Sequence, residues 1–278
     1  MQMSWDLDFI SEKDFREHVK STIEKYKEKM RDYNLIEFNR NIVDPIKLLF
    51  DKSVYHKTWE EIISSEIFRQ RDKSSNNDIG YFHQNIFKYF KGCQVPNAGW
   101  DVIFKKTDGI QVYADGGKVQ TIYVEMKNKH NTMNSSSSAK TYIKMQNQIL
   151  NDDNCACFLV EVIAKESQNT IWRTKVDNQN VSHRLIRRVS MDQFYSIVTG
   201  DKYAFYKMCK VLPHIINDII KEDNQIKEQN DTVIDDLKTQ WNSVYSDLDY
   251  ELAMTLSMYM LGFSSYLGFD RPINFIRR

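Results

Sequence analysis

Three charged residues, Asp101, Glu125 and Lys127, lie on segments whose patterns predict neighbouring β-strands. Asp101 opens the first segment directly after the Gly99-Trp100 corner, and the other two belong to the segment TIYVEMK. Because side chains alternate along a strand, Glu125 and Lys127 share a face and stand roughly 6–7 Å apart. A neighbouring strand is expected to bring the Asp101 carboxylate beside that of Glu125.

Two carboxylates and a lysine are a known solution to phosphodiester hydrolysis. Carboxylates and a backbone carbonyl, here that of Met126, offer the hard oxygen ligands that Mg²⁺ prefers. The ion neutralises charge on the phosphate and lowers the pKa of its bound water, while the lysine positions or deprotonates that water or stabilises the pentacovalent phosphorus. Glutamate and lysine must share a face for this chemistry, so one inward-facing apolar residue separates them, and Met126 fits that position.

A charged strand also produces Glu-x-Lys by chance, and the alternative interpretation is an ion pair on the face of an edge strand. Three features of the surrounding sequence favour the catalytic interpretation. They are the apolar alternation of the segment, the Gly-Trp-Asp corner before Asp101, and the polar, basic run directly after Lys127.

The longer strings IGYFHQNIF (79–87), GWDV (99–102) and VEMKNKHNTMNSSS (124–138) resemble type II restriction endonucleases of the PD-(D/E)XK superfamily, SinI/AvaII-like subgroup, which recognises GGNCC or GGWCC sites. The resemblance implies Mg²⁺-dependent cleavage of double-stranded DNA, with Asp101 and Glu125 as metal ligands and Lys127 as the catalytic lysine. One departure is that Trp100 stands where the superfamily name has proline. Members often carry a further acid or Gln on the preceding helix, and Gln84 or Glu61 is the candidate here.

Polar and basic residues after the catalytic strand are candidates for contacts with phosphates and base edges. The predicted DNA-binding residues are Asn128, Lys129, His130, Asn131, Ser135, Lys140, Lys144, Arg173, Arg184 and Arg187. Surface salt bridges are the alternative for each arginine, and a flexible linker with a helix cap is the alternative for the serine run 135–138. Arg184 and Arg187 face the same way if they lie on a helix.

The elements expected around these residues form an α/β (α+β) fold: a mixed, restriction-endonuclease-like sheet with helical extensions at both ends. Helices are predicted at 11–26, 41–50, 58–69 and 78–90, with a polar break at 72–77, then at 139–150 and from Ser190 to about residue 262; strands are predicted at 102–106, 110–114, 118–127, 155–165 and 169–176. We predict a single nuclease domain over 1–278, with a helical N-terminal region (1–77), a catalytic core (78–190) and a helical C-terminal region (191–278).

Composition excludes several classes of protein. Nine glycines and four prolines in 278 residues do not fit collagen-like or propeller chains, and no GxGxxG or GxxxxGK[ST] pattern occurs that would indicate a dinucleotide fold or a P-loop. The four cysteines form no CxxC pair, and Cys155 and Cys157 fall in an apolar run that predicts buried, reduced thiols. With no secretory signal and no membrane-spanning run, the sequence predicts a cytoplasmic, prokaryotic protein.

The charge is unevenly distributed, although Lys+Arg and Asp+Glu both number 38. Residues 127–188 hold ten basic and five acidic residues, whereas residues 221–251 hold three basic and nine acidic residues. A basic middle matches the footprint of a polyanion, with a solvated mixed surface as the alternative.

The predicted partner is double-stranded DNA, bound by a homodimer because a palindromic site is most simply served by two-fold symmetry. A cognate DNA methyltransferase is expected as a functional counterpart. Two other functions remain open: a repair or recombination nuclease on the same fold, and a non-catalytic DNA-binding protein.

Overall fold

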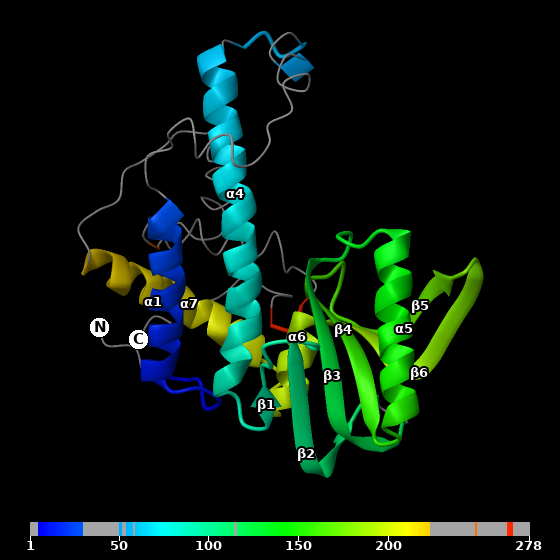
Figure 1. Cartoon of the computed structure of the whole chain (residues 1–278). Helices are drawn as coiled ribbons and strands as arrows, with labels where there is room; N and C mark the ends of the chain where they lie inside the picture. The colour runs from blue at the N-terminus through cyan, green and yellow to red at the C-terminus, as the bar shows by residue number, and fades with distance from the viewer. Residues whose placement is uncertain are drawn as a thin grey trace. The chain divides into compact units, whose positions relative to one another are not determined.

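The computed structural model in Figure 1 describes residues 5–29, 50–51, 54–57, 59–113, 116–222, 248 and 266–268. The chain separates into two compact units, one of residues 17–83 and one of residues 1–16 with 84–278. The helices predicted over 41–49 and after residue 222 lie outside the described residues. The single nuclease domain with its three regions stays a prediction.

Six strands form one mixed sheet within the described residues, in the order β1-β2-β3-β4-β6-β5. Their bounds are β1 (Cys93–Gln94), β2 (Val102–Gln111), β3 (Lys118–Lys129), β4 (Cys155–Ile163), β5 (Asn169–Val176) and β6 (Gln179–Ser190). β3, β4 and β6 run parallel, while β1, β2 and β3 are joined antiparallel, as are β5 and β6. The prediction of a mixed sheet with flanking helices is confirmed.

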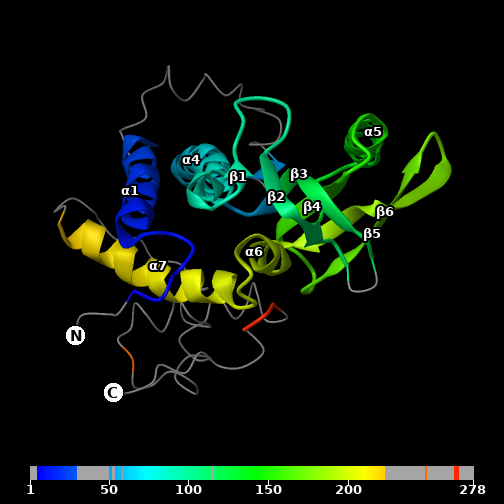
Figure 2. The same ribbon diagram turned by 90° about the horizontal axis from the view of Figure 1, so that it is seen from below.

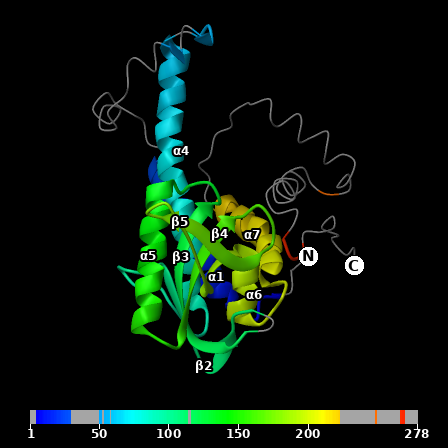
Figure 3. The same cartoon turned by 90° about the vertical axis from the view of Figure 1, so that its right-hand side faces the viewer.

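One helix covers each face of this sheet, as Figures 2 and 3 show: α5 (Ser135–Asn151) on one side and α6 (Met191–Thr199) on the other. Tyr142 of α5 is fully buried against Cys157 of β4, and Phe194 of α6 meets the ring of Phe158 on the opposite face of the same strand. Because both faces are covered, β4 reads as a continuous apolar run. The predicted buried thiols are confirmed, and all four cysteines are free.

Long helices precede and follow the sheet. They are α1 (Glu12–Lys29), α4 (Trp59–Asn85) and α7 (Ala204–Lys221), and a short 3-10 helix, η1 (Ile86–Tyr89), follows α4 directly. Ser11 caps α1 as expected, since its hydroxyl accepts from the Asp14 N–H at 3.1 Å. None of the described helices is long and apolar enough to cross a membrane.

The polar break predicted at 72–77 is wrong, because α4 continues through it. Asn76 donates a side-chain hydrogen bond to Asp72 at 2.9 Å, one helical turn back. Such polar residues lower helix propensity by only fractions of a kcal/mol each, roughly 0.5, which the flanking helical turns outweigh.

Two strand predictions also need correction. The segments expected at 102–106 and 110–114 are one strand, β2, whose register with β3 shifts between Lys105 and Ile110. β6 was not predicted, and Arg184 and Arg187 lie on this strand, so the condition of a shared helix is not met. The pairing of β6 with β5 shifts register after Ser182. This shift interrupts the alternation of apolar and polar residues by which a strand is recognised in a sequence.

Candidate active site

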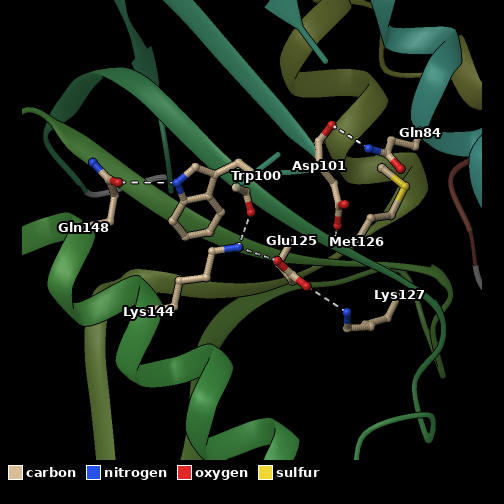
Figure 4. A network of polar contacts seen from close by, with 9 residues as sticks. Gln84, Trp100, Asp101, Glu125, Met126, Lys127, Lys144 and Gln148 are labelled. Carbon is tan, nitrogen blue, oxygen red and sulfur yellow. Dashed lines mark hydrogen bonds and ion pairs between the residues drawn. The ribbon is translucent and has the colours of Figure 1, made fainter. Parts of the chain in front are cut away.

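Strand pairing brings the two predicted carboxylates together. Val102 of β2 pairs with Val124 of β3, so Asp101 and Glu125 follow at the same level of the sheet. The Asp101 N–H donates to the Val124 carbonyl at 3.0 Å. The Asp101 Oδ2 accepts from the Met126 N–H at 2.7 Å, and Figure 4 shows these two residues side by side. The Asp101 side chain is therefore fixed against the strand that carries the other two catalytic candidates.

β3 lies between β2 and β4, so the alternative of an edge strand is wrong. The predicted alternation along it is confirmed: Ile122 and Val124 are fully buried on one face, and Glu125 and Lys127 are half-buried on the other. An interior strand does not need a charged face for solubility, so the charges on β3 require another explanation.

Glu125 is held between two ammonium groups. Its Oε1 lies 2.8 Å from the Lys127 Nζ and its Oε2 lies 2.8 Å from the Lys144 Nζ (Figure 4). Burial would raise the pKa of Glu125, since only 18% of its side chain is exposed, but hydrogen bonds from both lysines outweigh burial and hold the pKa below its ordinary value. Glu125 is therefore ionised in the folded protein.

Lys144 reaches this site from α5 and was predicted as a DNA contact. Its ammonium also donates to the Gly99 carbonyl and lies 4.0 Å from the centre of the Trp100 ring, whose Nε1 donates to Gln148 one turn along α5 at 3.3 Å (Figure 4). These contacts attach the Gly99-Trp100 corner to α5. Trp100, the residue before Asp101, thus has a structural role.

Asp101 has the opposite electrostatic environment to Glu125. Burial raises its pKa, and the nearby negative charge of Glu125 raises it further, although the Met126 N–H and the two lysines act against this. Two carboxylates that repel each other in a half-buried site fit a divalent cation. No three His, Cys, Asp or Glu side chains gather around a possible metal in the described part of the chain, so a cation here would depend on these two carboxylates and backbone oxygen.

Gln84 is the accessory candidate that the structure brings to the site. Its Nε2 donates to the Asp101 carbonyl at 3.2 Å, as Figure 4 shows. Glu61 is exposed and belongs to the other compact unit.

The polar run after Lys127 begins at the end of β3 and continues into a turn. Asn128 and Lys129 are the last residues of β3, and His130 and Asn131 form the turn. Two further residues hold this turn, and the sequence analysis did not predict that role for either: Glu161 of β4, 1% exposed, pairs with Arg188 of β6, and Arg188 donates to the His130 carbonyl at 2.9 Å. A lone glutamate within the apolar run CACFLVEVI was the available signal.

The serine run is neither a linker nor the cap. α5 starts at Ser135 instead of near residue 139, and Asn134 caps it by accepting from the Ser137 N–H at 2.8 Å. Asn is one of the strongest capping residues, which explains the earlier start. Ser135 and Lys140 are exposed on this helix.

The three predicted arginines have different environments. Arg173 and Arg184 are exposed on the β5–β6 hairpin. Arg187 is 6% exposed; its guanidinium donates to Asn169 and to the Arg184 carbonyl, and it lies over the Tyr113 ring. Burial lowers the pKa of Arg187, and this guanidinium is used within the fold.

Comparisons with known proteins agree with this geometry. The family model described as Eco47II restriction endonuclease matches residues 7–221, which include every candidate site residue. The type II restriction enzyme Sau96I of Staphylococcus aureus is 26% identical over 223 residues, covering 77% of this chain and 81% of that enzyme. The type II restriction enzyme Eco47II of Escherichia coli is 26% identical over 227 residues, which cover 78% of this chain and 89% of that enzyme.

Proposed function

This chain belongs to the Eco47II restriction endonuclease family, and from that premise we propose that it is a type II site-specific deoxyribonuclease that hydrolyses phosphodiester bonds of double-stranded DNA with Mg²⁺. The observation that carries the proposal is that Asp101 and Glu125 lie at one level of neighbouring strands, with Lys127 two residues further along β3 and in contact with Glu125. A network of structural ion pairs would not require two half-buried carboxylates to face each other.

Asp101, Glu125 and the Met126 carbonyl would hold the Mg²⁺ ion. Restriction endonucleases are typically metal-dependent, and the two-carboxylate donor set fits a hard cation. When bound, the ion supplies neutralisation of phosphate charge and a more acidic water. Asp101 is prepared for this role because the Met126 N–H orients its carboxylate, and Gln84 steadies its backbone.

The two lysines divide the remaining work. Lys144 contacts Glu125, the Gly99 carbonyl and the Trp100 ring, so it is the more firmly held cation and orients the Glu125 carboxylate. Lys127 contacts Glu125 from the same strand, and the exposures of the two lysine side chains are similar, 30% for Lys127 and 36% for Lys144, so the contacts and not the exposure distinguish them. We assign to Lys127 the contact with the reacting phosphate or the attacking water, where a positive charge stabilises the transition state.

The target class is a short G·C-rich palindrome of the GGNCC or GGWCC type. This assignment rests on the resemblance of the catalytic segment to the SinI/AvaII-like subgroup. A two-fold homodimer and a cognate DNA methyltransferase follow from the same assignment, since both strands must be cut and the host DNA must be protected.

Digestion of unmethylated plasmid DNA tests the proposal. We expect discrete fragments with Mg²⁺, none with EDTA and none from Lys127→Ala, whereas Lys106→Ala, an exposed lysine of β2, should cut like the wild type. Sequencing of the fragment ends identifies the site.

The alternatives give different results. A smear or trimmed ends would favour a repair or recombination nuclease. Salt-dependent DNA binding with no cleavage in Mg²⁺ or Mn²⁺ would favour a non-catalytic DNA-binding protein.

A further inference from the structure

The β5–β6 hairpin extends beyond the portion of the sheet that β4 supports. β6 pairs with β4 over Ile186–Ser190, whereas its earlier residues Gln179–Ser182 pair with Arg173–Val176 of β5. Figures 1 and 2 show this two-stranded ribbon, residues 173–182, projecting from the sheet on the side of α5. Asp177 and Asn178 close it with φ of 48° and 63°, the two positive values of the tight hairpin turn whose twist matches the strands.

One face of the ribbon is anchored. Val176 and Val181 pack against the buried cluster that contains Tyr142 and Met145 of α5 and Trp172 of β5. Below the ribbon, Arg187 bonds to Asn169 of β5 and to the Arg184 carbonyl of β6, so it joins the two strands at their base. The packing of the two valines and the Arg187 hydrogen bonds therefore hold the ribbon in place on the sheet.

The other face is entirely polar. Residues that pair across an antiparallel ladder share a face, so Arg173 with Ser182 and Lys175 with Asn180 point away from the valines. All four side chains are exposed, and none is acidic. Arg184, also exposed, follows in the stretch where the register shifts.

We propose that this face of the ribbon enters the major groove of the DNA substrate and reads base edges. The inference rests on the proposed function. The major groove admits a two-stranded β-ribbon, and arginine, asparagine, lysine and serine are the side chains that hydrogen-bond to purine and pyrimidine edges there. Arg173 and Lys175 supply donors that suit guanine, Asn180 supplies the donor and acceptor that suit adenine, and the positive charge suits the surrounding phosphates.

Binding to a pool of random duplexes, with Ca²⁺ in place of Mg²⁺ and sequencing of the bound fraction, tests the ribbon. Arg173→Ala, Asn180→Ala and the triple variant Arg173→Ala/Lys175→Ala/Asn180→Ala leave both valines in place, so folding is not at risk. The control is Lys106→Ala, which removes an exposed charge from β2 of the same sheet. We expect each single variant to lose preference at particular base pairs, by tenfold or more, while the control keeps the wild-type preference.

Salt dependence separates base reading from phosphate contact. Removing a phosphate contact weakens binding to all sequences alike and lowers the salt slope by about one per charge, whereas removing a base contact relaxes preference at one position. Uniform weakening in the triple variant, or an unchanged preference, would overturn the inference.

The failure of the ribbon and the failure of the nuclease assignment are distinguishable. If the wild type cuts at discrete sites and the triple variant cuts at the same sites, the proposal that the ribbon reads base edges is wrong, and the nuclease assignment stands. A wild type that selects a sequence through the ribbon yet cuts no DNA with Mg²⁺ overturns the nuclease alone. A wild type that selects no sequence overturns the ribbon, whatever it cuts.

Discussion

Strand β3, which carries two of the catalytic candidates, and strand β6, which carries part of the proposed recognition ribbon, lie in the same sheet but obey different constraints. β3 is paired on both sides, and its residues alternate between buried and half-buried from Ile122 to Glu125. β6 is supported by β4 over its last residues, and its first residues form a ribbon with β5. Hydrolysis requires groups at fixed spacing on a rigid strand, whereas reading a groove requires a polar surface that projects.

The same contrast separates residues of one type. Arg187 and Arg173 are both arginines of the hairpin strands, but Arg187 is buried among hydrogen-bond acceptors and Arg173 is exposed. Lys144 and Lys140 lie one turn apart on α5, and Lys144 is bound to Glu125 while Lys140 faces solvent. The sequence assigned all four to DNA, and each pair now provides a matched experiment.

The largest effect is expected at Lys127. Lys127→Ala should lower the cleavage rate by about 10²–10⁴-fold, because the reacting phosphate or water loses its cationic partner, while DNA affinity changes little. Single-turnover cleavage and a binding titration measure the two quantities. Cleavage at the wild-type rate would remove Lys127 from the catalytic group.

Asp101→Asn should abolish the response of cleavage to Mg²⁺ and also stabilise the protein without metal. The folded-state pKa of Asp101 is raised by burial and by Glu125, so its contribution to stability is present below its ordinary value of 3.8 and lost as the pH rises through the folded-state value. Asparagine keeps the neutral form at every pH. We expect a higher Tm than the wild type at neutral pH in EDTA, with the difference vanishing in acid; a lower Tm at neutral pH would contradict this account.

Arg187→Gln should separate structure from recognition. The lost hydrogen bonds to Asn169 and the Arg184 carbonyl leave part-buried acceptors without their partner, and we expect the free energy of unfolding to fall by about 2 kcal/mol in urea titrations. Arg173→Gln should change stability by less than about 0.5 kcal/mol because its side chain is exposed. Equal stability losses in the two variants would contradict the contrast drawn between them.

The smallest effect is expected at Lys144. Lys144→Met removes a cation from Glu125 and from the Trp100 ring, which should lower the free energy of unfolding by about 1 kcal/mol. Lys140→Met is the control with the same change of charge and should be neutral. If both variants unfold at the same urea concentration, the Lys144 contacts that join α5 to the Gly99-Trp100 corner do not contribute to the free energy of unfolding.

Much of the site could be predicted because its signals are local. Asp101, Glu125 and Lys127 follow from alternation along two strands and from one corner, and strand pairing places them as expected. α5 starts four residues earlier than predicted because Asn134 caps it, and the serines that follow are part of the helix. β6 was missed because a register shift interrupts the only periodic signal a strand has.

Local sequence was enough to predict the mixed sheet and to point to type II restriction endonucleases, and it brought forward three catalytic candidates, since alternation and short motifs act over a few residues. Tertiary packing decided which cations serve the site and which serve the fold. Lys144 meets Glu125 from 19 residues away, and Arg188 meets the His130 carbonyl from 58 residues away. The direction and partners of a long basic side chain depend on what the folded chain packs around it, and no local pattern records that.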